Sequence, residues 1–295
     1  MSAFDAARRA ALMHELLGVL LGRPTDLLPF DEVRQRLRLR HVVDRGTREV
    51  PLDRIVGSLG RPREFTRAFL PREESLRARW EEVRSLAEGP GGFPTVELYQ
   101  VGDAYFVVDG HHRVSVARDL GQPTVEAHVR EFLTPVPLAA TDSAADVLCK
   151  AALADFLAAA RIEPAAAEEF RVTEPGGYGR MLEHIEVHGY FRGQELRRSL
   201  QWGEAVASWR ETVFRPMVQI IRDSGILADF PGRTEADLYL FTIDHLHHLR
   251  QRYGDQSVAP VRAVQHFRLR ERARRGWAAR IGGWWRNRGG RFSTG

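Results

Sequence analysis

The sequence is poor in three things: cysteine, lysine and long apolar runs. It holds one cysteine, Cys149, so an intramolecular disulfide framework is excluded and a reducing compartment is expected. No stretch approaches the roughly 20 apolar residues that span a bilayer. The N-terminal apolar run, residues 16–21, is short and lacks the small-residue cleavage site that is typical of a secretory signal. These absences predict a cytoplasmic protein without a transmembrane segment.

Lysine is almost missing, because Lys150 is the one lysine among 43 basic residues. A guanidinium group is always charged and binds phosphate or carboxylate bidentately, but the codon bias of a GC-rich genome explains most of this excess. The distribution of charge is more informative. Residues 262–295 hold ten arginines and one acid, so they carry +9; the chain carries +4, which leaves −5 for residues 1–261. Such asymmetry favours an acidic partner for the tail: nucleic acid, an anionic membrane or the rest of the chain.

Length and composition place the chain among folded proteins of one large or two modest domains. It has 295 residues, of which 43% are hydrophobic and 28% charged, which excludes a wholly disordered, collagen-like or coiled-coil chain. Periodicity in the first part predicts two helices, a strand with a loop, and a charged helix. These elements are expected at residues 5–21, 31–40, 50–56 and 73–88.

The middle of the chain predicts a hairpin followed by a strand, a tight turn and a helix. Residues 96–101 alternate apolar and polar side chains, a Gly-Asp turn follows, and residues 104–108 return as an almost wholly apolar strand. A helix is expected from residue 111 up to Gly121, which acts as its stop, and residues 124–130 alternate again as a strand. The fold class expected here is therefore α+β.

The C-terminal half is expected to be mostly helical, with no internal repeat. Helices are predicted over residues 143–160, 203–224 and 234–252. The resulting division has four parts: N-terminal helices (1–44), an α+β domain (45–135), a helical domain (140–257) and a basic tail (262–295).

The strongest chemical signal is the segment Asp109, Gly110, His111, His112 and Arg113. A buried strand delivers the chain to a turn that glycine permits, and the helix that follows offers free N–H groups and a dipole to an anion. The arginine adds a bidentate grip on phosphate, the aspartate can hold a metal ion or orient a histidine, and the imidazoles can donate to phosphate oxygens or move protons. The plainer interpretation is a helix start with surface imidazoles.

This segment, with the helix over residues 114–118, resembles the phosphate-binding motif of the ParB/sulfiredoxin superfamily. The Asp-Gly-His-His-Arg form is that of archaeal free-serine kinases of the same fold. Residues 50–55 are similar to the first strand of that fold, and residues 58–65 to the ParB loop that ends in Pro-Arg before a helix. The resemblance covers about residues 45–135.

The resemblance implies a small mixed-sheet domain with flanking helices that cradles a nucleoside triphosphate, CTP or ATP, with Mg²⁺. It implies a ligand-binding set drawn from both motifs: Ser58, Arg61, Arg63, Gly110, His111, His112 and Arg113. It implies a metal ion beside Asp109, a catalytic role for Asp109, His111 and His112, and Glu64 as the base if a hydroxyl group is phosphorylated.

Three functions are consistent with these patterns. The leading hypothesis is a ParB-like nucleotide-binding regulator, with or without slow hydrolysis, that acts on DNA through the arginine-rich tail or on a protein partner. The alternatives are a Mg²⁺-dependent small-molecule phosphotransferase and a membrane-peripheral scaffold. The motif holds no cysteine, which excludes sulfiredoxin chemistry, and it lacks Gly-Glu-Arg-Arg, while no helix-turn-helix is evident. Whether two copies form a homodimer stays open.

Other polar clusters favour helix surfaces over sites. His184 and His188 stand at i and i+4, a spacing that can bind a metal, and Asp244 precedes His245, His247 and His248. Residues 188–254 are faintly similar to a bacterial helical domain family of unassigned function, in which Trp209 and Tyr239 are expected to be core anchors. The tail bears an apolar stripe with three interpretations, namely an unstructured tail, a nucleic-acid arm or a membrane or partner helix: Trp277, Ile281, Trp284 and Trp285.

Overall fold

The computed structural model describes residues 2–89, 94–253, 261, 262 and 264–269. The chain divides into two compact units, Met1–Ala154 and Asp155–Gly295. The first unit holds a mixed β-sheet with helices, and the second is helical where it is described, so the expected fold class is confirmed. The four-part division of the chain stays a prediction. Within the described residues, no helix is long and apolar enough to cross a bilayer.

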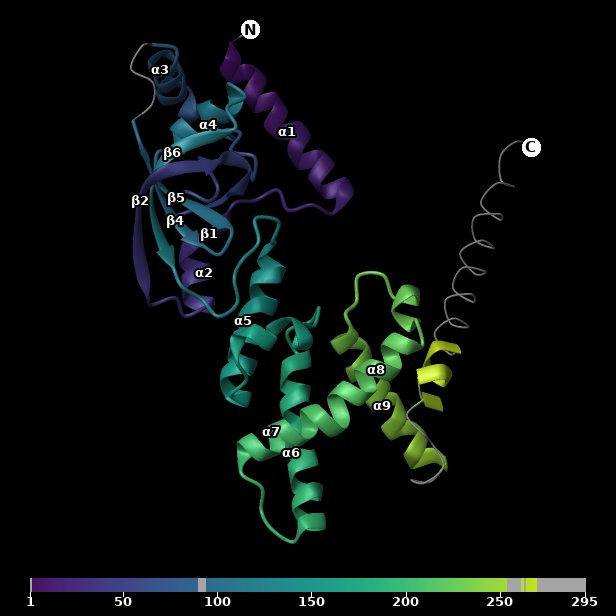
Figure 1. The fold of residues 1–295 in the computed structure, drawn as a ribbon. Helices are drawn as coiled ribbons and strands as arrows, with labels where there is room; N and C mark the ends of the chain where they lie inside the picture. Colours follow the sequence, from purple (N-terminus) through teal and green to yellow (C-terminus); the bar gives the residue numbers. More distant parts are fainter. Residues whose placement is uncertain (1, 90–93, 254–260, 263, 270–295) are drawn as a thin grey trace, which may run out of the picture. The chain divides into compact units, whose positions relative to one another are not determined.

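Six strands in the order β1-β3-β5-β4-β6-β2 form the sheet of the first unit (Figure 1). Strand β5 lies at its centre, parallel to β3 and antiparallel to β4, while β4 and β6 are parallel and β2 pairs antiparallel with β6. The strands are β1 Leu28–Pro29, β2 Val42–Pro51, β3 Ile55–Ser58, β4 Val96–Val101, β5 Ala104–Asp109 and β6 Thr124–Phe132.

The predicted hairpin is present as β4 and β5. Gly102 makes the turn at φ +62°, and Val101 pairs with Ala104 directly across it. Since side chains alternate along a strand, Val107 enters the hydrophobic cluster on one face of the sheet and Phe106 the cluster on the other. Burial on both faces explains why residues 104–108 are almost wholly apolar.

Helices cover both faces of this sheet, and each face has its own core. One cluster joins Phe4 of α1 (Ala3–Leu21), Trp80 of α3 (Arg77–Ala87) and Val114 of α4 (His111–Asp119) to the inner side chains of the strands. The other joins Phe30 and neighbours of α2 (Phe30–Arg36) and Val147 of α5 (Ala144–Ala160). The short helices η1 (Leu52–Arg54) and η2 (Glu74–Leu76) connect these elements.

Two sequence predictions in this unit are wrong in detail. The expected strand over residues 50–56 is split: β2 begins at Val42, ends at Pro51 and is followed by η1 and β3. Gly46 lies within β2 at φ +67°, where the register with β6 shifts as in a β-bulge. Helix α2 ends at Arg36, four residues early, because Arg38 adopts φ +50°.

The second unit consists of helices around an aromatic core. Trp209 and Tyr239 are fully buried among Phe170 and Phe214, as expected of core anchors. The predicted helix over residues 203–224 is interrupted by a π-helical turn. The i, i+4 spacing of His184 and His188 is the only part of α6 that the sequence indicates. The helices are η3 Pro164–Phe170, α6 Gly177–Leu196, α7 Trp202–Trp209, η4 Arg210–Phe214, α8 Arg215–Asp223, η5 Ile226–Asp229 and α9 Glu235–Tyr253.

Candidate functional site

The junction of β5 and α4 has the strand–turn–helix geometry that the sequence predicts. Strand β5 ends at Asp109, Gly110 turns the chain at φ +101°, and α4 begins at His111. A Cβ atom on Gly110 would lie 2.6 Å from Val96 Cγ1, so glycine is required for space as well as for conformation. No side chain caps the helix at Gly110. The first-turn N–H groups of α4 are therefore left for another acceptor.

His111 is a buried, neutral side chain. It is 6% exposed, and its Nε2 lies 2.7 Å from Oγ of Ser58, which is also buried at the end of β3. Burial, and after it the positive charge of the nearby Arg61, lowers the pKa of His111 to about 4. The structure therefore joins the two sequence motifs, one on β3 and the other on α4, through one hydrogen bond.

His112 is held in the same neutral state but faces different groups. Its pKa is lowered to about 4, first by burial and then by the positive charges of Arg61 and Arg79. Phe65 packs against both imidazoles, near-parallel to His111 and edge-on to His112. The buried Nδ1 of His112 has no hydrogen-bond partner among the residues that the structure describes.

Arg113 links the start of α4 to the residues just before β4. Its guanidinium donates to the carbonyl oxygens of Pro94 (3.0 Å) and Thr95 (2.7 Å) and forms an ion pair with Asp109. These contacts fix the side chain along the wall of the cavity at this junction. A direct grip of Arg113 on phosphate stays a prediction.

The loop after β3 contributes Arg61 to the same place. Arg61 is half exposed, its backbone N–H donates to Ser58 Oγ (3.3 Å), and its side chain pairs with Glu64 (3.4 Å). Arg63 is exposed, and neither Arg63 nor Glu64 lines the cavity. The two sequence motifs thus meet through Ser58 and Arg61.

These residues line a cavity of about 450 Å³ at the N-terminus of α4. Three arginines and one aspartate line it and both histidines are neutral, so the lining side chains carry an excess of positive charge. The carboxylates of Glu64 and Glu82, which pair with Arg61 and Arg79, lie outside the lining. Its lining is Leu59, Gly60, Arg61, Arg79, Val83, Val108, Asp109, Gly110, His111, His112 and Arg113.

Arg79 is the lining cation that sequence reasoning missed. It lies on α3, far from either motif in the sequence, and pairs with Glu82 (2.7 Å) on the same helix. Nothing in the local pattern separates it from the other arginines of this charged helix. Only the packing of α3 beside α4, through the buried hydrogen bond from Trp80 Nε1 to Ser115 Oγ (2.9 Å), brings it to the cavity.

Asp109 is the one predicted metal ligand. Its carboxylate is largely exposed and pairs with Arg113, and no cluster of three or more metal-binding side chains occurs within the described residues. Magnesium is commonly held by one or two carboxylates together with substrate phosphates. A single carboxylate at the edge of a cavity that could hold phosphate fits that pattern.

The polar clusters of the second unit serve its packing. His184 Nδ1 lies 2.9 Å from Tyr239 Oη, whereas His188 Nε2 lies 2.8 Å from Ser208 Oγ, so the two imidazoles have separate partners. Asp244 pairs with Arg180, and His245 Nε2 bonds His266 Nδ1 at 2.8 Å. The predicted tail stripe lies outside the described residues.

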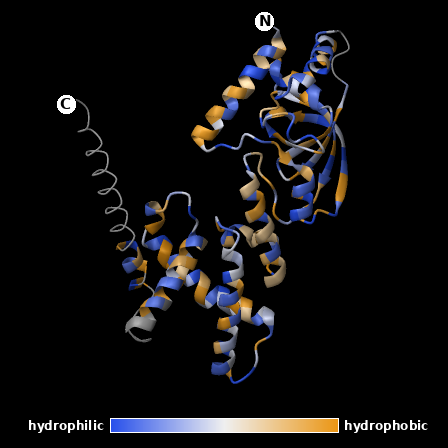
Figure 2. Cartoon of the chain, turned by 180° about the vertical axis from the view of Figure 1, so that it is seen from behind, coloured by the Kyte–Doolittle hydropathy of each residue, from blue (hydrophilic) through white to orange (hydrophobic). Residues whose placement is uncertain are grey.

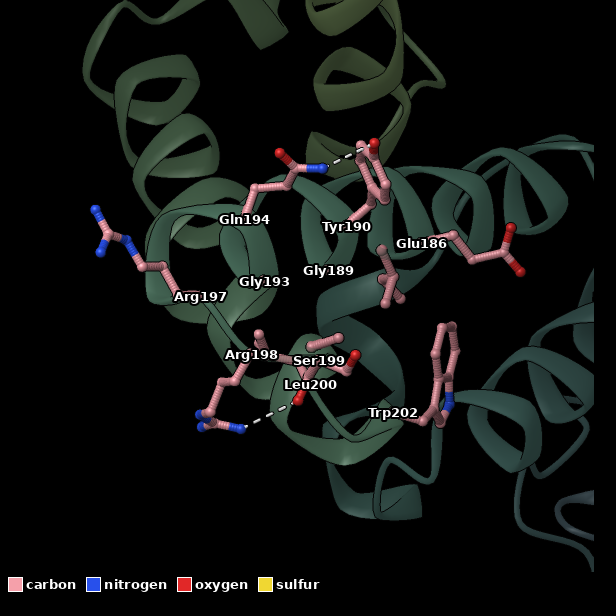
Figure 3. Close-up of a pocket in the computed structure, with 12 residues that line it drawn as sticks. Glu186, Gly189, Tyr190, Gly193, Gln194, Arg197, Arg198, Ser199, Leu200 and Trp202 are labelled. Carbon is pink, nitrogen blue, oxygen red and sulfur yellow. Dashed lines mark hydrogen bonds between the residues drawn. The ribbon is translucent and has the colours of Figure 1, made fainter.

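The second unit also has an open groove of about 690 Å³ between α6 and the segment that leads to α7 (Figure 3). Tyr190 and Trp202 stand on opposite sides of it, and Arg197 points away from it. Arg198, on the same side as Trp202, is paired with both carboxylate oxygens of Glu204. The groove therefore lacks the convergent donors that the α4 cavity offers.

Comparisons with known proteins find similarity in fold. No protein-family model matches the chain, and no curated protein matches it. The chain is similar to sulfiredoxin and to ParB. Sulfiredoxin from Arabidopsis thaliana is 18% identical over 31% of this chain and 86% of its own, with a TM-score of 0.19. Truncated ParB from Caulobacter crescentus, complexed with CTP-gamma-S, is 18% identical over 55% of this chain and 91% of its own, with a TM-score of 0.23.

Sulfiredoxin and ParB are the two kinds of protein after which the superfamily of the sequence resemblance is named. Identity and TM-score at this level carry no argument about ligand or activity. What the α4 cavity can do must follow from its own contacts.

Proposed function

We propose that the cavity at the N-terminus of α4 binds the phosphate groups of a nucleotide. The observation that carries this proposal is the uncapped first turn of α4, which opens into a cavity that Arg61 and Arg79 also line. Free N–H groups and the helix dipole together attract phosphate. The two arginines supply charge-assisted donors from the loop after β3 and from α3.

The volume and lining of the cavity favour a ligand larger than free phosphate. Its volume of about 450 Å³ falls in the range of small-molecule sites. Leu59, Val83 and Val108 add apolar surface next to the polar wall. In this proposal a nucleoside rests on this surface while its phosphates reach α4, and Asp109 would share a Mg²⁺ ion with them.

The neutral histidines favour binding over proton transfer. With pKa values near 4, His111 and His112 enter the site as uncharged hydrogen-bonding groups at neutral pH. Glu64, the expected base of a phosphotransferase, does not line the cavity and is paired with Arg61. We therefore place a nucleotide-binding regulator ahead of a phosphotransferase. The DNA-binding role of the tail stays a prediction.

The test is isothermal titration calorimetry of the full chain with CTP, ATP, GTP and ADP in the presence of Mg²⁺. We expect at least one of them to bind, and Arg61→Ala and Arg79→Ala each to weaken it about tenfold or more, since a hydrogen bond to a charged group contributes about 1.5–3 kcal/mol. Arg54→Ala is the matched control: Arg54 is 50% exposed against 51% for Arg61, and it too pairs with one carboxylate.

Binding of none of the four nucleotides contradicts the proposal. Equal losses in the Arg54 and Arg61 variants also contradict it, because they would place the effect in the general charge of the unit. Nucleotide binding followed by transfer of phosphate to serine would support the alternative function, a phosphotransferase.

A further inference from the structure

Helix α1 presents a large apolar surface to solvent in its C-terminal half. Its N-terminal half is anchored, since Phe4, Ala7 and Ala11 are buried and Asp5 pairs with Arg77 of α3 (2.5 Å). Beyond that point the helix is mainly orange in Figure 2. Val19 and Leu20 are 81% and 79% exposed, and the whole set with about half or more of the side chain in solvent is Leu12, Met13, Leu16, Leu17, Val19, Leu20 and Leu21.

The polar residues of this half-helix face the unit that carries it. Glu15 pairs with Arg72 at 2.7 Å, and burial lowers the pKa of His14. Gly18 is buried, and a Cβ there would lie 2.0 Å from a methyl group of Thr25. The outer face over residues 12–21 therefore holds no charged side chain. Exposed apolar surface of this extent marks an interaction site.

The width of the face distinguishes between kinds of occupant. At 3.6 residues per turn, the seven exposed apolar residues spread over about 200° of the helix circumference. A seam between two helices uses a narrower stripe, two positions in seven. A second copy of α1 would leave much of this arc in water. A flat lipid surface, into which a helix sinks along half its circumference, covers it.

Charge elsewhere in the chain suits an anionic surface. The exposed Arg23 follows α1 directly, and residues 262–295 carry ten arginines against one glutamate. Stable attachment at a membrane surface takes two signals, such as an apolar insertion and a polybasic segment. The chain holds both.

We propose that the outer face of α1 inserts into the interface of an anionic phospholipid bilayer, with the helix lying in the plane of the membrane. This is a property of α1 and is separate from nucleotide binding at α4. It requires no spanning segment, in agreement with the absence of one from the described helices. Apolar contact supplies the insertion, and the basic residues select the anionic leaflet.

The test is cosedimentation of the full chain with vesicles of phosphatidylcholine alone and of phosphatidylcholine mixed with phosphatidylglycerol. We expect binding to the mixed vesicles and little to the neutral ones. The double variant Leu16→Gln/Leu20→Gln should lose about tenfold or more in lipid affinity, because two leucine side chains no longer enter the bilayer. Glutamine keeps the helix propensity of leucine, so the fold should persist by circular dichroism.

The matched control is Leu86→Gln, which alters an exposed leucine at the end of α3 in the same unit. It should bind vesicles like the wild type. Equal binding by the double variant, or no binding of the wild type to mixed vesicles, overturns the proposal. A dimer in sedimentation velocity that the double variant converts to monomer, without lipid binding, would assign the face to a second copy instead. Nucleotide affinity measured on the same variants separates this outcome from any failure at α4.

Discussion

His111 is a buried imidazole that lines the α4 cavity, and its protonation should affect the stability of the fold. Its pKa is about 4 in the folded chain against 6.5 in the unfolded chain, so the unfolded chain binds more protons between these two values. The unfolding free energy should therefore be fully retained above about pH 6.5 and fall as the pH drops towards 4. The upper bound on this loss is about 3 kcal/mol.

Urea titrations at a series of pH values measure this effect. In His111→Gln the fall between pH 6.5 and 4 should be shallower than in the wild type, because glutamine does not titrate. The same slope in both proteins would show that the buried imidazole does not govern the acid stability of the unit.

Tyr239 has a comparable structural role in the second unit. Its hydroxyl accepts a hydrogen bond from Trp209 Nε1 (3.0 Å) and shares one with His184 Nδ1 (2.9 Å), while burial raises its pKa. Tyr239→Phe leaves these partners buried and unsatisfied, so we expect a loss of about 1–3 kcal/mol in unfolding free energy. Tyr190→Phe, which alters an exposed hydroxyl bonded only to Gln194 in the described structure, should cost under about 0.5 kcal/mol in the same denaturant experiment. Equal losses of unfolding free energy in the two variants would show that the hydrogen bonds of Tyr239 do not stabilise the fold.

A glycine lies at each end of α4, and the two allow the cost of a positive φ to be measured apart from the cost of a steric clash. Gly110 at φ +101° has Val96 in the place of a Cβ atom, whereas Gly121 at φ +70° has open space around it. Gly121→Ala should cost the left-handed strain alone, about 1–2 kcal/mol. Gly110→Ala adds overpacking, for about 3 kcal/mol or more in total, and should abolish nucleotide binding in calorimetry. Equal stability of the two variants would show that the Val96 side chain moves to accommodate the added methyl group at little cost.

Local pattern predicts the elements of the first unit well, and the site only in part. The apolar strand, the glycine and the helix after it stand within a dozen residues, so the turn at Gly110 follows from sequence alone. The bulge in β2 and the early end of α2 depend on positive φ values at Gly46 and Arg38. Strand pairing and loop contacts decide these, and a single sequence does not display them.

The lining of the α4 cavity also depends on contacts that a single sequence does not display. Ser58 meets His111 because β3 and β5 are neighbours in the sheet, and the sequence resemblance could indicate this pair. Arg79 reaches the cavity because Trp80 anchors α3 beside α4. The chain has 42 arginines, most of which reflect its overall composition. Only tertiary packing distinguishes Arg79 from the others.

At the scale of the whole molecule, the lining residues that the structure describes for the α4 cavity all belong to the first unit. All the lining residues of the α4 cavity fall between Leu59 and Arg113, within Met1–Ala154. A fragment of residues 1–160, which ends with α5, should therefore bind nucleotide with the affinity of the full chain in calorimetry. A marked loss in a fragment that circular dichroism shows to be folded would mean that the second unit contributes to the site.

The central claim is that phosphate binds the first turn of α4. Amide-resolved NMR of the 1–160 fragment, titrated with the nucleotide that binds best, tests it most directly. We predict the largest shifts at the backbone N–H groups of residues 111–113, because these donors gain a charged acceptor. Arg61→Ala should weaken this response. Saturable binding that leaves these three amides unmoved while others shift would contradict the account.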